Sequence, residues 1–146
     1  MTIPKRNSLF ALNIVFPLLW GAFIYLTKAE PTYLSDYLHA FRKVFPTISY
    51  PYIIRNFACD FLWSYSLFFC LRLTLGDQLK GKHNTVVIIV SAVAAVILET
   101  VQLFKSVPGT FDPFDLVTEL VAIAFALLIT TIIERRFKHY EKKSVN

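Results

Sequence analysis

The stretch from Thr85 to Ile133 reads TVVIIVSAVAAVILETVQLFKSVPGTFDPFDLVTELVAIAFALLITTII, and it decides the fold. Two long apolar runs flank a short polar turn. Each run carries a single charged residue, Glu99 in the first and Glu119 in the second. The runs cover about 18 to 20 residues each, the length that an α-helix needs to cross hydrocarbon about 30 Å thick. We therefore expect two transmembrane helices joined by the turn.

Two similar runs precede this stretch, and the composition agrees with a membrane protein. Hydrophobic residues make up 55% of the 146 residues and charged residues only 17%, a balance that soluble domains of this size rarely show. The prediction is an all-α integral membrane bundle of four transmembrane helices in a single domain, 1–146. The helices are expected near 8–27, 56–75, 85–104 and 113–134, followed by a basic tail over 135–146.

The distribution of basic residues predicts an orientation. If the amino terminus lies in the cytoplasm, ten of the fifteen Lys and Arg residues fall on the inner side and five on the outer side. The positive-inside rule then predicts that both termini lie in the cytoplasm. The net charge of +5 is explained by loops and a tail that face anionic lipid, so no nucleic-acid partner is implied.

The first outer loop, Lys28 to Arg55, has a pattern of its own. Thr32 or Ser35 can cap a short helix that Pro46 ends, and apolar residues recur on one side of it. The pattern predicts a short amphipathic helix lying on the outer membrane surface. A loop folded over the bundle as a lid is the alternative.

Polar residues recur at helical spacing beside small residues in three of the predicted helices. Small residues let helices approach closely, and intramembrane ionisable groups usually face the bundle interior. We therefore expect one acidic pocket, open to the outside, where the outer ends of these helices meet. Glu99, Gln102, Asp112 and Asp115 are its candidate site residues, and Asp60, Glu119, Arg55 and Asn56 support them, with Lys105 as a second nearby cation.

Several of these residues also have a purely structural interpretation. Asp112 before Pro113 has the form of an N-cap followed by proline at the first helical position. Asp115 then stands at the third position, where an acid can return a capping hydrogen bond. Glu99 and Gln102 can form an ordinary interhelical hydrogen bond.

Four carboxyl groups in one pocket would repel each other strongly. Two remedies are open, namely protonation of some of the groups or a bound hard divalent cation, which prefers oxygen ligands of this kind. No other cofactor is suggested by the residues.

The segment from Asp60 to Leu128 resembles the VanZ-like family of small bacterial membrane proteins. That family pairs Glu-x-x-Gln at the end of one helix with a glycine-bearing loop and an Asp-x-x-Asp-x-x-x-Asn-x-x-Gly-x-x-x-Gly run that opens the next. The matching residues here are Glu99, Gln102, Gly109, Asp112 and Asp115. Glu119 stands at the asparagine position, and Ala122 and Ala126 stand at the two glycine positions. The loop lacks the arginine that the family often has there, unless Lys105 takes its place.

The resemblance implies a multi-pass protein of the bacterial cell envelope, in a family whose founding member is associated with low-level teicoplanin resistance. It implies no known reaction. The sequence therefore does not decide whether the protein is an enzyme.

Three functions compete at this stage. The first is binding or modification of a membrane lipid or lipid-linked envelope precursor, with Glu99 or Asp115 as general acid or base and Gln102 as the orienting residue. The second is a non-catalytic accessory protein whose polar cluster joins helices. The third, a transporter, is disfavoured because four helices without an internal repeat leave little room for alternating access.

Overall fold

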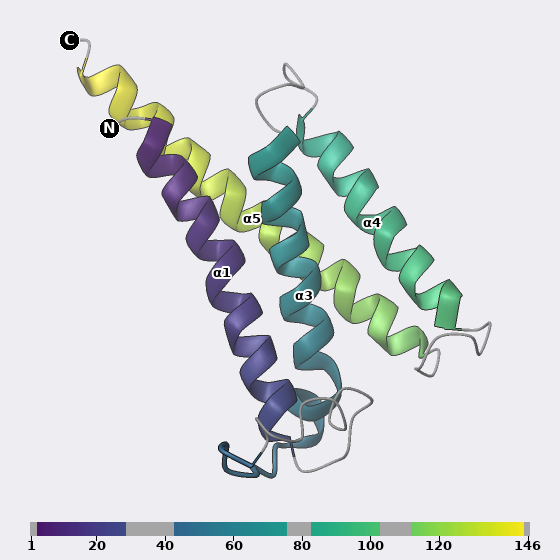
Figure 1. Ribbon diagram of the computed structural model, residues 1–146. Helices are drawn as coiled ribbons and strands as arrows, with labels where there is room; N and C mark the ends of the chain where they lie inside the picture. The colour runs from purple at the N-terminus through teal and green to yellow at the C-terminus, as the bar shows by residue number, and fades with distance from the viewer. Residues whose placement is uncertain (1–2, 29–42, 76–82, 103–111, 145–146) are drawn as a thin grey trace.

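The computed structural model describes residues 3–28, 43–75, 83–102 and 112–144 and contains four long helices in these segments (Figure 1). They are α1 (Ile3–Thr27), α3 (Tyr52–Leu75), α4 (His83–Gln102) and α5 (Pro113–Ser144). Each contains a segment long and apolar enough to cross a membrane. The chain is thus a polytopic, all-α membrane protein with four candidate spans.

The helix bounds differ from the expected ones mainly at three places. α1 begins at Ile3, ahead of the expected start near residue 8. α3 begins at Tyr52, directly after Pro51, whose carbonyl accepts the first backbone hydrogen bond of the helix from Arg55 at 3.0 Å. α5 has 32 residues, or about 48 Å at 1.5 Å per residue. It therefore continues past its membrane-spanning part, Pro113–Phe137, into the basic segment expected as a tail.

The helices alternate in direction. One end of the bundle, which we call the N/C end, contains the first residues of α1 and α4 and the last residues of α3 and α5 (Figure 1). The opposite end, where α1 and α4 end and α3 and α5 begin, is called the far end. α3 is central and packs against each of the other three helices.

The segment that returns from α1 to α3 is described only from residue 43 onward. Residues 43–51 form turns and extended chain without a helix, and the amphipathic helix expected after Thr32 or Ser35 falls mostly outside the described residues. Ile48 donates a backbone hydrogen bond to the Thr27 carbonyl at 2.8 Å, and the hydroxyls of Thr27 and Tyr50 lie 2.7 Å apart. These contacts fix the end of α1, with Lys28 directly after it, at the far end of the bundle.

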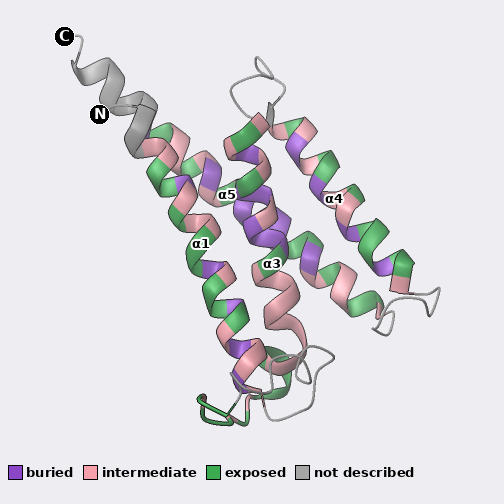
Figure 2. Ribbon diagram, in the orientation of Figure 1, coloured by how far each residue is buried: buried purple, intermediate pink, exposed green. Residues whose placement is uncertain are grey.

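The hydrophobic core fills the part of the bundle nearer the N/C end. Phe10 of α1 meets Phe69 of α3 edge to face at 5.6 Å between ring centroids. Val87 of α4 and Ala122 and Ala126 of α5 complete the buried cluster. The half of α3 nearer the far end is only partly buried (Figure 2).

A buried ion pair joins α3 and α5 near the N/C end. Arg72, which is 4% exposed, forms a salt bridge with Glu134, and its guanidinium lies 5.9 Å from the centre of the Phe10 ring. Charged residues within a membrane bundle are usually paired in this way and face its interior.

We predict that Arg72→Met destabilises the protein by up to about 3–5 kcal/mol, because it leaves the partly buried carboxylate of Glu134 without its partner. The double variant Arg72→Met/Glu134→Leu should recover most of that loss, since an apolar pair can replace a buried ion pair. Unfolding titrations of the purified protein in detergent measure both. Arg136→Met, at an exposed position of α5, is the control, and a double variant as unstable as the single one would contradict the prediction.

Candidate functional site

Four carboxyl groups from three helices gather in the far half of the bundle. Asp60 comes from α3, Glu99 from α4, and Asp115 and Glu119 from α5. Asp60 lies close enough to Asp115 and Glu99 for their charges to interact, and Glu119 interacts with the other three. We call these four residues the acid cluster. The structure thus brings together the acids that the helical stripes placed on facing sides.

Glu99 is one of the two fully buried members of the acid cluster. It is 4% exposed because it continues the small-residue face of α4, on which Ala95 is also buried. Its Oε1 accepts a hydrogen bond from Gln102 Nε2 at 3.1 Å, one helical turn further along. The backbone N–H of Asp112 also interacts with this carboxyl group. Its Oε2 has no hydrogen-bond partner of standard geometry among the described residues.

Glu119 is the second fully buried member, also 4% exposed. Ser64 of α3 donates a hydrogen bond to its Oε1 at 3.2 Å, which joins α3 to α5. Its Oε2, like that of Glu99, has no hydrogen-bond partner among the described residues. Buried polar atoms are rarely left in this state because an unmet hydrogen bond is costly. Two such oxygens in one cluster form a site that can accept hydrogen bonds from a ligand.

Asp112 has a clear structural role at the start of α5. Its Oδ1 accepts a hydrogen bond from the backbone N–H of Phe114 at 2.9 Å, and its carbonyl accepts one from Asp115 at 3.0 Å. Pro113 follows as the first helical residue. This is the N-cap arrangement that the sequence suggested as one alternative. The charge of Asp112 also acts on two members of the acid cluster, Glu99 and Asp115. The charge of Asp115 acts on Asp60 and Glu119, so Asp115 belongs to the acid cluster.

The two supporting residues at the start of α3 interact with each other. Arg55 Nε donates to Asn56 Oδ1 at 3.3 Å, and its guanidinium lies 5.7 Å from the centre of the Tyr52 ring. The cation whose charge acts on Asp60 is Lys28, which sequence reasoning had not assigned to the site. Lys105, the other expected cation, lies outside the described residues.

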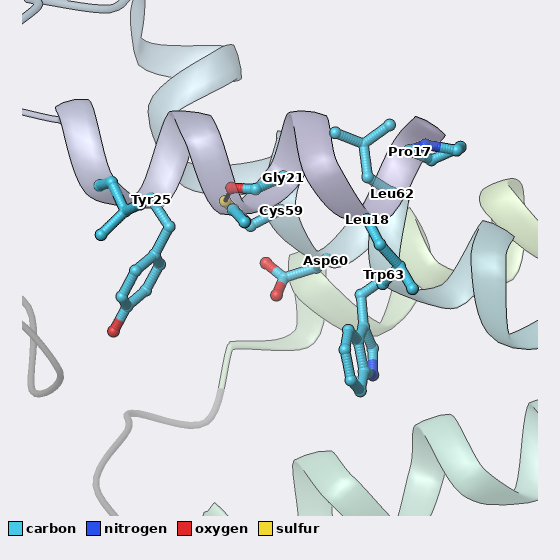
Figure 3. A pocket seen from close by; sticks show the side chains of 10 residues that line it. Pro17, Leu18, Gly21, Tyr25, Cys59, Asp60, Leu62 and Trp63 are labelled. Atoms are coloured by element: carbon cyan, nitrogen blue, oxygen red, sulfur yellow. Dashed lines mark hydrogen bonds between the residues drawn. The ribbon is translucent and has the colours of Figure 1, made fainter. Parts of the chain in front are cut away.

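A groove between α1 and α3 leads to the acid cluster from the side (Figure 3). Its volume is about 450 Å³, and its lining is mostly apolar. Asp60 is the carboxylate among the described residues of that lining. The Cys59 thiol, also in the lining, donates to the Gly21 carbonyl at 3.7 Å. The sequence does not predict this groove. Its walls come from two helices, and the hydrophobic pattern of each helix does not determine how the two are rotated relative to each other.

Metal binding was one of the hypotheses for the acid cluster. Within residues 3–28, 43–75, 83–102 and 112–144, no group of three or more His, Cys, Asp or Glu side chains is placed so that it could hold a metal ion.

Helical spacing places Ser64 on the same stripe as Asn56 and Asp60, and the structure shows that its hydroxyl donates to Glu119. Sequence reasoning missed the ion pair between α3 and α5, which its own signals could have found. Arg72 and Glu134 are opposite charges near the same ends of two predicted spans, which makes them candidates for a pair.

Comparisons with protein-family models, with curated proteins and with solved structures find no match to this chain. The function is therefore argued from the site alone.

We predict that Asp112→Ala lowers the free energy of unfolding by about 0.5–2 kcal/mol, because α5 loses its N-cap. Asp112→Ser should stay close to wild type, since serine caps a helix as well as aspartate does. Thermal unfolding in detergent provides the measurement. If the serine variant were as unstable as the alanine variant, the charge of Asp112 rather than its capping bond would be the stabilising feature.

Proposed function

We propose that the chain is a VanZ-like protein of the bacterial cell envelope whose acid cluster binds, or modifies, a membrane lipid or a lipid-linked envelope precursor. The observation that carries the proposal is the pair of buried carboxyl groups, Glu99 and Glu119. Each has one oxygen that accepts a hydrogen bond from a neighbouring side chain and one without a partner among the described residues. A head group rich in hydroxyl or amine donors would satisfy both.

The same geometry supports a division of roles. Gln102 orients Glu99, and Ser64 orients Glu119, so the unpartnered oxygens are held in place rather than free to turn. A positioned carboxyl beside a reacting group can act as general acid or base. Glu99 and Asp115 are our candidates for that role if a reaction takes place.

Membrane lipid is the partner that the four helices contact. The helices expose many large apolar side chains, such as Leu12, Phe16 and Ile97, as membrane-spanning helices do. The basic residues then place both termini in the cytoplasm, so that the acid cluster opens toward the outside of the cytoplasmic membrane. Envelope lipids and their precursors are handled on that side.

A non-catalytic accessory role is the second candidate. It is favoured by the Ser64–Glu119 hydrogen bond, which joins α3 to α5, and by the Asp112 cap. Polar contacts between membrane helices contribute about 0.6 kcal/mol each on average. On this account the acid cluster serves only to hold helices together.

We expect Glu99→Gln and Glu119→Gln to unfold within about 1 kcal/mol of wild type, because glutamine keeps the acceptor oxygen that Gln102 or Ser64 binds. Both should nevertheless abolish the change that the wild-type protein causes in radiolabelled envelope lipids of cells. Thr100→Val is the matched control, since Thr100 is exposed beside Glu99 and bonds only within its helix. Loss of stability and of the lipid change in parallel would favour the accessory role. Identical lipid profiles with and without the wild-type protein would exclude a lipid function.

A further inference from the structure

The acid cluster contains hydrogen-bond acceptors that lack matching donors. Gln102 donates to Glu99 Oε1, and Ser64 donates to Glu119 Oε1. The Oε2 atoms of both glutamates are buried and have no partner of standard geometry among the described residues. Ionised carboxylates only accept hydrogen bonds, so a ligand of these two atoms has to be a hydrogen-bond donor.

The charges that act on Glu99, Asp115 and Glu119 from the described part of the chain are all negative. Glu119 is acted on by the other three members of the acid cluster. Asp115 and Glu99 are both acted on by Asp112. A buried carboxylate is costly unless an opposite charge and hydrogen bonds compensate it. A cationic donor therefore supplies what these three groups lack, whereas a neutral sugar supplies hydrogen bonds alone.

The described basic residues near the cluster are engaged elsewhere. Lys28 is the one whose charge acts on the cluster, and it acts on Asp60. Its ammonium also lies 5.1 Å from the centre of the Tyr25 ring. Arg72 forms its salt bridge with Glu134 near the N/C end. The two unpartnered oxygens are therefore left for a cation that is not among the described side chains.

The position of the cluster in the bundle indicates what kind of molecule carries this cation. All four acids lie within the membrane-spanning parts of α3, α4 and α5. Asp60 also lines the α1–α3 groove, level with Gly21 (Figure 3). The groove is mostly apolar, and its volume of about 450 Å³ falls in the range of small-molecule sites. A ligand that reaches the cluster by this route needs an apolar body.

We propose that the acid cluster binds a primary ammonium group carried by a membrane-soluble amphiphile. The ammonium donates hydrogen bonds to Glu99 Oε2 and Glu119 Oε2, and its charge balances the carboxylates. The apolar body extends into the α1–α3 groove beside Asp60. This inference rests on the proposed lipid-binding function and names the head-group chemistry that the site selects.

Four amphiphiles with identical decyl chains provide the test. Decylamine carries charge and N–H donors, decyltrimethylammonium carries charge alone, decyl glucoside carries hydroxyl donors, and decyl phosphate carries negative charge. Binding of tritiated decylamine to the protein in phosphatidylcholine nanodiscs is measured at neutral pH by scintillation proximity. The other three serve as competitors, and empty nanodiscs give the blank. We expect decylamine to bind about tenfold more tightly than each competitor, because a hydrogen bond to a charged group contributes about that much.

The same measurement is made on variants of the two buried acids. Glu99→Gln and Glu119→Gln should each weaken decylamine binding about tenfold, because a neutral amide replaces a charged acceptor. Thr100→Val should bind decylamine as the wild type does, since Thr100 is exposed beside Glu99 and bonds only within its helix. Thermal unfolding of the same preparations shows which variants are folded. The ranking of the four amphiphiles on the wild-type protein decides the question even if a variant fails to fold.

Each other ranking overturns the proposal. Equal competition by decyltrimethylammonium means that charge alone is recognised and that the two Oε2 atoms take no part. Stronger competition by decyl glucoside or decyl phosphate assigns the site a different head group, and the proposed function then stands while this inference fails. No specific binding of decylamine means that protons or the chain itself neutralise the cluster. If decylamine binds as expected while Glu99→Gln leaves the cellular lipid change intact, the amine site stands and the proposed function fails.

Discussion

The polar groups that α3 carries into the membrane have to find partners on other helices, and this requirement shapes the bundle. Near one end Arg72 pairs with Glu134 of α5, and further along Ser64 bonds to Glu119 of the same helix. An unpaired charge in hydrocarbon costs several kcal/mol, so these two contacts together restrict both the rotation and the register of α3 against α5. The hydrogen bond from Tyr65 to Asn13 at 2.5 Å does the same between α3 and α1.

The two halves of the bundle then serve different purposes. Toward the N/C end, aromatic and small residues fill the space between the helices, with Phe68 and Phe69 fully buried. Toward the far end, α3 is only partly buried, and grooves open on both sides of it, between α1 and α3 and toward α5. Tight packing in one half supports a looser, more polar half in which a ligand has room to bind.

The acid cluster is unusual because the protein only partly satisfies it. Asp112 forms the capping bonds of α5, whereas Glu99 and Glu119 each keep one buried oxygen that has no partner in the part of the chain that the structure describes. Packing alone would favour apolar residues at such positions, since a half-satisfied polar network is less stable than an apolar core. The cost of keeping two carboxyl groups there is the physical reason to look for a function at this end of the molecule.

Length and hydropathy alone determined that the chain forms four membrane-spanning helices, because crossing hydrocarbon leaves a long apolar segment no other hydrogen-bonded form. Helical spacing also placed Glu99 and Glu119 on small-residue faces that turn inward, and the Asp112–Pro113 pair indicated the start of α5. Only the tertiary structure decided which groups meet across helices. The Arg72–Glu134 pair and the α1–α3 groove that contains Asp60 depend on the rotation and crossing of helices that are distant in sequence, which a periodic pattern within one helix does not specify.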